Sequence, residues 1–520
     1  MTETKSNPWL VAFAVSLATF MEVLDTTITN VSLSHIGGSL AASQEESTWV
    51  MTSYLVSNAI ILPLSGWLAG AIGRKKYFML SIGFFTLASF FCGAATSLWM
   101  IIVFRLLQGI AGGGLQPTQQ AILLDTFPLE KRAQANALTA VTMIVAPVIG
   151  PTLGGFITDN IDWRWIFFIN VPVGLFALFL VKRLYHEHVE TIPKGPIKVD
   201  YLGFALVALG IGAIQIVLDK GQQDDWFDSN FITSMTVMGI SMLGLAGWWL
   251  MRQEAPLVEL RLFKIVTFRL ACILIFFMGF VLYGSSILLP LLVQTYFGYD
   301  AMLAGMILSP GGIAIILMMP ITTKLIGRVA PKFLIAFGFF LCSVGIFYTM
   351  HFSPVTNLGT FIAMRIMTVS GLPFLFIPIS TMAFLNVPRH LNNKASALYS
   401  LCRNLGGSFG IALIATYLAR HQQIWQTYLS ARISAYSVET HQALSQHAAA
   451  LIGTGTSPAV AAAQSQGMLY SQMLRQAGFM AYVDSFQAMA FVMILLVPVA
   501  LLMPGSMPKK AAKDALEGVH

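Results

Sequence analysis

Long apolar stretches of about 20 residues recur along the whole chain, and they restrict its fold more than any other feature of the sequence. An α-helix of about 20 residues crosses the ~30 Å hydrocarbon core of a bilayer and satisfies its backbone hydrogen bonds internally. A transmembrane β-barrel would instead show alternating segments of about 10 residues. Charged residues make up only 10% of the 520 residues, against roughly 25% in soluble domains. The sequence therefore predicts an all-α polytopic membrane protein.

Fourteen such stretches are present, and each is predicted to form one membrane-spanning helix. They lie at about 9–33, 46–70, 77–97, 99–124, 134–158, 164–183, 200–218, 231–251, 268–293, 301–323, 333–351, 357–384, 395–418 and 485–503. No small-residue cleavage site follows the first stretch, so it is expected to be a retained helix and not a signal peptide.

Lysine and arginine gather in every second loop, which predicts how the helices are oriented. Such clusters follow the second, fourth, sixth, eighth, tenth and twelfth stretches and also close the chain, as at Arg74–Lys76, Lys131–Arg132 and Lys509–Lys513. Basic loops of membrane proteins face the cytoplasm, so both termini are predicted to be cytoplasmic. The net charge of +7 is therefore an orientation signal, and we expect no nucleic-acid partner.

Two arginines suggest that the chain contains an internal repeat. Arg105 lies about one and a half turns into the fourth stretch, and Arg365 lies at a similar depth in the twelfth. Without the seventh and eighth stretches, each arginine belongs to the fourth helix of a set of six, as in the repeats of secondary transporters. The predicted parts are a six-helix bundle at 1–184, a linker with two inserted helices at 185–267, a six-helix bundle at 268–508, and a tail at 509–520.

One long polar segment, residues 419–484, interrupts the second bundle on the side opposite the basic loops. It is rich in Gln, Ala and Ser, has amphipathic helical patterns at both flanks, and is broken at Gly453–Pro458. The segment is either a partly ordered surface loop or a docking element for a partner on the far side of the membrane, because long loops are often functional.

Ionisable residues inside membrane helices are costly, which makes them candidates for function. Glu22 and Asp25 lie three residues apart in the first stretch and share one helix face. Counted along the helices, both acids and Arg105 fall roughly 20–24 Å from the cytoplasmic boundary, so the three charges could meet. This layer predicts either a proton-coupling site, because burial and a nearby arginine shift a carboxyl group in opposite directions, or a static ion pair. Asp125, at the cytoplasmic end of the fourth stretch, is expected to face water.

The second half carries arginines inside its helices but no acid in the ninth to thirteenth stretches. Arg365 either contacts backbone carbonyls and water or offers its charge to an anionic substrate, and Arg403 lies in the thirteenth stretch, the next along the chain. Drug pockets are apolar and adaptable, so candidates for substrate contact come from helix position alone. These candidates are Tyr54, Gln116, Phe280, Tyr283, Arg365, Phe374 and Arg403.

Several other kinds of site have no support in the sequence. The four cysteines lie singly in apolar stretches, and the nine histidines form no helical pair suited to a metal, so we expect no metal and no other cofactor. No phosphate loop of the type G-x-x-x-x-G-K-[ST] is present, which excludes an ATP-driven pump on one chain. Gly406–Gly410 matches G-x-S-x-G by coincidence, because no strand precedes it. An enzyme is therefore not expected.

Several motifs resemble those of the major facilitator superfamily. Gly66–Lys76, after the second stretch, is similar to the family's signature loop, and Leu24–Val31 resembles the first-helix motif of its fourteen-span drug:proton antiporters. Arg105–Gly109 and Gly150–Gly155 are similar to the proton-transfer and antiporter motifs, and Gly150–Gly155 also joins a helix breaker to small residues that allow close packing. The segments Trp163–Gly174, Leu218–Gly221 and Asp225–Phe227 also look like that branch, in its EmrB type.

This resemblance implies the major facilitator fold, two six-helix bundles plus two inserted helices, and proton-driven export of lipophilic drugs, uncouplers or fatty-acid-like amphiphiles. It implies a bacterial inner membrane with its lipid, a periplasmic membrane-fusion adapter of the EmrA type and an outer-membrane channel as partners. Asp25 would be the first-helix acid beside Glu22, Arg105 the proton-transfer arginine, and Gly66, Gly73 and Arg74 parts of the gate. Gly150, Pro151, Gly154 and Gly155 would form the hinge.

One position departs from the family pattern, and one other transport function remains open. Gly70 stands where the signature loop normally has an acid, so a gating latch that depends on that carboxylate is in doubt. The alternative function is a proton-coupled symporter, or a uniporter, for a small nutrient or metabolite; the antiporter-like segment at Gly150–Gly155 argues against it.

Overall fold

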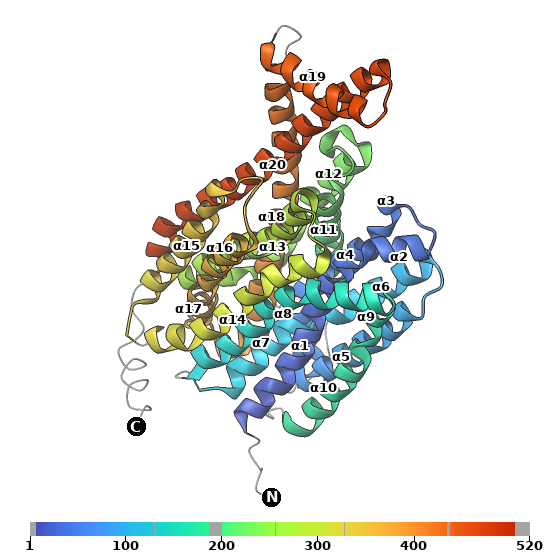
Figure 1. Cartoon of the computed structure of the whole chain (residues 1–520). Helices are drawn as coiled ribbons and strands as arrows, with labels where there is room; N and C mark the ends of the chain where they lie inside the picture. The colour runs from blue at the N-terminus through green and yellow to red at the C-terminus, as the bar shows by residue number, and fades with distance from the viewer. Residues whose placement is uncertain are drawn as a thin grey trace, which may run out of the picture.

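The computed structural model describes residues 7–128, 131–186, 200–254, 256–326, 328–433 and 437–504, and all regular structure in these ranges is helical (Figure 1). Thirteen helices, counting consecutive short helices together, are long and apolar enough within these ranges to cross a membrane. The predicted all-α polytopic architecture is confirmed.

The first half of the chain forms six of these elements. They are α1 (Pro8–Val31), α4 (Trp49–Ile72), α5 (Arg74–Gly93), α6 (Leu98–Gly112) with α7 (Leu115–Thr126), α8 (Arg132–Asn160), and α9 (Trp165–Phe168) with α10 (Asn170–Leu184). The short helices α2 (Leu33–Ser39) and α3 (Gln44–Ser47) connect α1 to α4. Two of the predicted stretches are thus divided: the fourth bends between α6 and α7 at Gly113–Gly114, and the sixth between α9 and α10.

Two helices follow between the halves, where the inserted pair was predicted. They are α11 (Tyr201–Lys220) and α12 (Asn230–Arg252); the 3-10 turn η3 (Trp226–Asp228) lies between them, and η4 (Leu260–Lys264) follows α12. α11 packs against α4 of the first half and α18 (Asn392–Ser430) of the second. α11 therefore lies along the seam between the two halves, and α12 packs against α11.

The second half repeats the pattern of long and divided helices. Its elements are α13 (Val266–Phe297), α14 (Ala301–Ile326), α15 (Pro331–Phe347) with η5 (Tyr348–His351), α16 (Leu358–Ser370) with α17 (Leu372–Ala383), η6 (Arg389–Leu391), α18, α19 (Val438–Gly453) and α20 (Pro458–Leu501). α18 contains the predicted stretch 395–418 but is absent from the thirteen apolar helices, because Arg403, Asn404 and Ser408 make it more polar.

The segment 419–484 is not a loop. α18 continues to Ser430, α19 follows, and α20 begins at Pro458, so the predicted break at Gly453–Pro458 separates two helices. The described residues of this segment, 419–433 and 437–484, form what we call the helical extension, which projects from one end of the bundle (Figure 1). α1 begins and α20 ends at the opposite end, called here the terminal end. The polar composition made this segment resemble a loop, because only helices that cross a membrane need a long apolar stretch. Helices outside the membrane can be polar.

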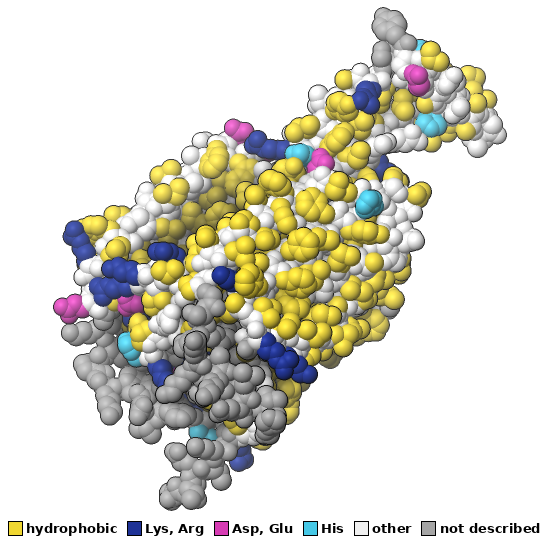
Figure 2. Space-filling model, turned by 90° about the vertical axis from the view of Figure 1, so that its left-hand side faces the viewer, with side chains coloured by type: hydrophobic (Ala, Val, Ile, Leu, Met, Phe, Trp, Pro, Cys, Tyr) yellow, Lys and Arg dark blue, Asp and Glu magenta, His cyan; other side chains and the backbone are white. Residues whose placement is uncertain are grey.

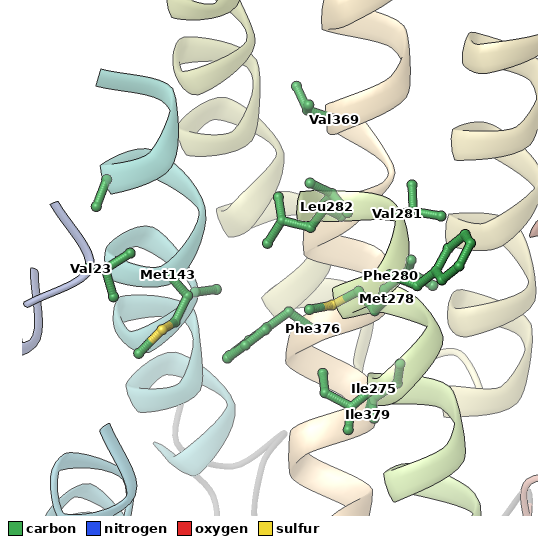
Figure 3. Packing of buried hydrophobic residues seen from close by; sticks show 14 of the residues in the cluster. Val23, Met143, Ile275, Met278, Phe280, Val281, Leu282, Val369, Phe376 and Ile379 are labelled. Carbon is green, nitrogen blue, oxygen red and sulfur yellow. The ribbon is translucent and has the colours of Figure 1, made fainter. Parts of the chain in front are cut away.

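Apolar side chains face both inward and outward, as expected of a protein whose surroundings are lipid. The core joins the two halves: Figure 3 shows Val23 of α1 and Met143 of α8 opposite Leu282 of α13 and Phe376 of α17. The outer surface of the bundle is largely hydrophobic, whereas the extension is mixed (Figure 2). Large exposed apolar residues such as Phe84 and Ile240 would be unfavourable in water, which supports a lipid environment.

Candidate functional site

A buried ion pair between Asp25 of α1 and Arg105 of α6 lies inside the first half. Arg105 Nη1 is 2.5 Å from Asp25 Oδ2, and both side chains have no exposed surface. Arg105 also donates from Nε to the Val50 carbonyl at 3.1 Å and from Nη1 to Gln108 Oε1 at 2.8 Å. Because removing one partner of a buried pair leaves an uncompensated charge, this contact fixes α1, α4 and α6 together.

Two amides complete the environment of Asp25, and neither was among the predicted site residues. Asn170 of α10 donates to Asp25 Oδ1 at 2.7 Å, and Gln108 donates to the same oxygen at 3.0 Å. Asn170 also donates to Ser89 of α5 at 3.0 Å. Both amides lie in segments that resemble family motifs, which is the signal that could have identified them.

Glu22 lies in the same helix but has a different set of partners. Its carboxylate accepts hydrogen bonds from Gln116 Nε2 at 2.6 Å, from the Tyr54 hydroxyl at 3.0 Å and from Asn58 Nδ2 at 3.3 Å. Within the described residues no ion pair of Glu22 occurs, so the prediction that all three charges meet is wrong for Glu22. The structure brings together Asp25 and Arg105 and separates Glu22 from them.

Tyr54 of α4 connects the two acidic sites. Its ring lies 4.3 Å from the Arg105 guanidinium carbon, within the range of a cation–π contact, while its hydroxyl donates to Glu22. A movement of Arg105 would therefore displace the Tyr54 ring and change the hydrogen bond that Tyr54 donates to Glu22.

A cavity opens beside Glu22 at the seam between the halves. It is lined by residues of α1, α4, α7, α11, α13 and α18: Glu22, Val23, Thr26, Tyr54, Leu55, Asn58, Ala59, Gln116, Gln215, Tyr283, Leu401, Asn404, Leu405, Gly407, Ser408 and Ile411. Gln215 of the inserted helix α11 exchanges hydrogen bonds with Ser408 at 3.0 and 3.2 Å. Three predicted substrate residues, Tyr54, Gln116 and Tyr283, line this cavity.

The other four predicted substrate residues are buried but do not line the cavity. Phe280 and Phe374 belong to the hydrophobic core, where Phe280 is seen with Met278 and Val281 in Figure 3. Arg365 donates to the hydroxyls of Ser285 and Ser286, both at 3.1 Å, rather than to backbone carbonyls. Arg403 donates to Gln116 Oε1, and Gln116 in turn donates to Glu22. Arg403 thus reaches the Glu22 site through one amide.

The signature-like segment lies where α4 meets α18 at the terminal end. A Cβ atom on Gly66 would be 2.7 Å from the Asn393 carbonyl oxygen and 2.8 Å from Lys394 Cα, so only glycine permits this approach. Gly73, with φ of 90°, ends α4 and starts α5 in a conformation that favours glycine. Gly70, in contrast, has no atom within 4 Å of an added Cβ and lines a second cavity at this end.

A carboxylate does meet the signature arginine, although it comes from elsewhere in the sequence. Arg74 forms an ion pair with Asp125 of α7, and Asn392 of α18 donates to the same carboxylate at 3.1 Å. Asp125 remains partly exposed in this second cavity, in line with the expectation that it faces water, and α7 also brings it beside Arg74 of α5. Arg74 and Asp125 of the first half are thus linked to the second half without an acid at Gly70.

The predicted hinge segment is the place where α8 crosses α1. An added Cβ on Gly150 would be 2.6 Å from Thr27 Cβ, and one on Gly154 would be 3.2 Å from Ile28 Cα. Pro151 lies within the helix, and Gly155 is buried beside Gly154. The glycines Gly406 and Gly410 have a similar role in α18, since their added Cβ atoms would meet the backbone of α13 at Phe276 and Phe280. Gly406 and Gly410 are therefore positions of close helix packing. This agrees with the interpretation of the G-x-S-x-G match at Gly406–Gly410 as a coincidence.

Comparison with known proteins gives one family throughout. A model of the Major Facilitator Superfamily matches residues 15–411. The probable multidrug resistance protein EmrY of Escherichia coli is 37% identical over 447 residues, which is 84% of this chain and 87% of that protein. The fatty acid resistance protein FarB of Neisseria gonorrhoeae is 34% identical over 494 residues, 95% of both chains. The multidrug export protein EmrB of Haemophilus influenzae is 36% identical over 82% of this chain and 84% of its own.

Solved structures of transporters share the fold at low sequence identity. The human organic anion transporter MFSD10 (TETRAN) gives a TM-score of 0.59 at 11% identity, covering 94% of this chain and 99% of its own. The proton:xylose symporter XylE gives 0.58 at 13% identity, covering 98% of both chains. These two similarities concern the fold alone.

Proposed function

This chain belongs to the major facilitator superfamily of membrane transporters, and we propose that it exports lipophilic and amphipathic drugs in exchange for protons. It is a transporter and not an enzyme. Relatives that are named for multidrug export or fatty acid resistance, and that match over most of their length, support the direction and the breadth of substrate.

The single observation that carries the proposal is the sealed Asp25–Arg105 pair. The Asp25 carboxylate is held by Arg105 and Gln108 of α6 and by Asn170 of α10, so protonation of Asp25 would release three donors at once. Charges buried in membrane proteins commonly mark proton pathways. Because α1, α6 and α10 meet at this carboxylate, loading it with a proton would change their packing, which is what alternating access requires.

The terminal-end contacts supply a gate for this cycle. Arg74, Asp125 and Asn392 connect the two halves there, and Gly66 lets α4 and α18 approach. We propose that these contacts open and close, with Gly73 as the joint between α4 and α5, while Gly150, Pro151, Gly154 and Gly155 keep α8 movable along α1. The remaining predicted substrate residues, Phe280, Arg365 and Phe374, would become accessible only in another conformation.

The cellular setting is proposed from the extension and from the relatives. We propose a bacterial inner membrane with both termini in the cytoplasm, which places the helical extension in the periplasm. There it would dock a membrane-fusion adapter that leads to an outer-membrane channel. Exposed apolar side chains on the extension, among them Ile424 and Val438, suit such an interface.

The test is proton release from purified protein reconstituted in lipid, measured when a drug is added. The wild-type protein is expected to release protons and to accumulate drug inside inverted vesicles with an acidic interior. Asp25→Asn should insert normally, release no proton and confer no drug resistance. Resistance at the wild-type level in Asp25→Asn would overturn the assignment of Asp25, and uptake of substrate together with protons would favour a nutrient symporter instead.

A further inference from the structure

A groove runs along α5 and α10 on the outer surface of the first half, away from the seam between the halves. The two helices pack side by side (Figure 1). The lining of the groove in α5 extends from Lys75 to Leu87, and Leu178 contributes from α10. Its volume is about 640 Å³, and α5 rises about 18 Å over this length at 1.5 Å per residue. The groove therefore covers about one leaflet of a hydrocarbon core ~30 Å thick.

The walls of this groove are apolar, and a glycine leaves it open. Leu80, Phe84 and Leu87 of α5 are exposed to the surroundings of the bundle. Gly83 lies among them, and an added Cβ at Gly83 would meet no atom within 4 Å, so the space beside it is not filled by the protein. Because this surface faces lipid in a membrane protein, a hydrocarbon chain is the kind of group that fills such a space.

Positive charge gathers where the groove reaches the terminal end. Lys75 and Lys76 line it there, and Lys182 and Arg183 form the last turn of α10. Lys75 Nζ donates to the Lys182 carbonyl at 3.1 Å, so the two helix ends lie together. Neither α5 nor α10 contains an aspartate or glutamate, and the ion pairs between described residues include none of Lys76, Lys182 and Arg183. An apolar groove thus ends in a basic cluster to which its own helices supply no acid.

We propose that this groove is a binding site for an anionic phospholipid, with an acyl chain along α5 and the phosphate at Lys75 and Lys76. Basic clusters between membrane helices bind anionic head groups, and each lysine near the surface adds to the attraction. A zwitterionic lipid brings its own ammonium group, which the four basic side chains repel. The bound lipid would join the terminal ends of α5 and α10. This inference does not depend on the direction of transport or on its coupling to protons.

Lipid retention by the purified, detergent-solubilised protein tests the site, with intact-protein mass spectrometry as the readout. The probes are phosphatidylglycerol and phosphatidylcholine with the same acyl chains, and glycerol phosphate as the head group without chains. Gly83→Leu would fill the groove and keep every charge. Its control is Gly244→Leu on the outer face of α12, where an added Cβ also meets no atom within 4 Å.

A second pair of variants tests the charges at the end of the groove. Lys75→Gln with Lys76→Gln removes two charges from the basic cluster and leaves the apolar walls unchanged. Lys324→Gln with Lys332→Gln is the control, because it removes two charges from the ends of α14 and α15, outside the groove. The two double variants therefore have the same net charge.

The wild-type protein is expected to bind phosphatidylglycerol about tenfold or more tightly than phosphatidylcholine, since each lysine contributes roughly fivefold. The double variant at Lys75 and Lys76 should lose that preference, Gly83→Leu should bind phosphatidylglycerol at least about tenfold more weakly, and both controls should equal wild type. Equal binding of the two lipids by the wild type, unchanged binding in folded Gly83→Leu, or displacement of the lipid by an equal concentration of glycerol phosphate would overturn the inference. Proton release on adding drugs would still decide the export function independently.

Discussion

Arg105 satisfies four different groups at once, and this explains why an arginine is needed at this depth of α6. Its Nη1 binds Asp25 and Gln108, its Nε reaches the Val50 carbonyl, and its Nη2 lies 3.8 Å from the Met51 sulfur. A planar guanidinium presents five N–H donors in a fixed fork, whereas a lysine ammonium is a compact charge on a flexible chain. The position therefore depends on geometry as well as on charge.

We expect Arg105→Lys to keep the charge and lose most of the transport. A hydrogen bond to a charged group contributes about 1.5–3 kcal/mol, so losing one or more of these contacts predicts a drop of roughly tenfold to a hundredfold in drug efflux. Efflux from reconstituted vesicles would measure it. Arg164→Lys is the control, since Arg164 is partly exposed and pairs loosely with Asp162 at 3.7 Å. Normal efflux in Arg105→Lys would show that only the charge is used.

The depth of charged residues could be predicted from the sequence, but their direction could not. Counting residues along α1 and α6 placed Asp25 and Arg105 in one layer, and the structure pairs them. Glu22 lies three residues from Asp25, which is a rotation of about 60° around the helix axis. That rotation is enough to turn one carboxylate toward Arg105 and the other toward the cavity. Which of the two faces inward depends on the packing of α4, α7 and α18, which no motif in α1 encodes.

At the scale of the element, glycines determine how closely α4 and α18 pack. Gly66 and Gly70 lie one turn apart on α4, yet only Gly66 touches the backbone of α18. Gly66→Ala is expected to force the helices apart at a cost of about 1–3 kcal/mol, whereas Gly70→Ala should change stability by less than about 0.5 kcal/mol. Thermal unfolding and drug resistance of the two variants would be compared. Equal behaviour would mean that this contact does not limit the packing.

The helical extension shows what pattern reasoning misses. Stretches of apolar residues mark membrane helices, but a helix that leaves the membrane loses that signal while its backbone hydrogen bonds continue. α18 and α20 therefore extend beyond the predicted ends at 418 and 485, and the polar composition concealed them. At the base of the extension, Asp484 of α20 accepts hydrogen bonds from Trp425 at 2.6 Å and contacts His421 at 2.9 Å. This cluster holds the two helices together.

A truncation that spares the base of the extension would test adapter docking. Gln426 of α18 donates to the Tyr470 hydroxyl at 3.2 Å, so the two helices are close enough there to be joined by a short glycine–serine turn. Removing residues 428–468 in this way keeps Trp425 and Asp484. The variant is expected to insert and to bind drug, and to lose co-purification with the adapter. Undiminished co-purification would place the docking surface on the remaining base of the extension, which includes Ile424, or on another part of the protein.

At the scale of the whole molecule, several polar contacts between described residues join the two halves, among them Asn136 to Thr381 at 3.2 Å. Another is at the terminal end, between Asn392 and Asp125, and a third is central, from Arg403 through Gln116 to Glu22. The all-α polytopic fold could be predicted from the sequence, and the repeat of Arg105 and Arg365 adds the prediction of a six-two-six arrangement. The central contact could not, because it depends on how α7 and α18 face each other across the seam, and sequence periodicity gives no information on the placement of one half against the other.

The central contact predicts that Glu22 and Arg403 act together in transport. Gln116 bonds to both, so losing either end frees the amide to reorient and changes what the other end contributes. In a double-mutant cycle on efflux rates, Glu22→Gln and Arg403→Gln are expected to be non-additive by about 0.5–3 kcal/mol. Arg365 is the matched control: it is equally buried in the second half but bonds to Ser285 and Ser286, so Glu22→Gln and Arg365→Gln should add within about 0.5 kcal/mol. Additivity in both cycles would mean that Gln116 does not couple the two halves in transport. Coupling confined to Arg403 would make Gln116 the link between the carboxylate of the first half and the movement of the second.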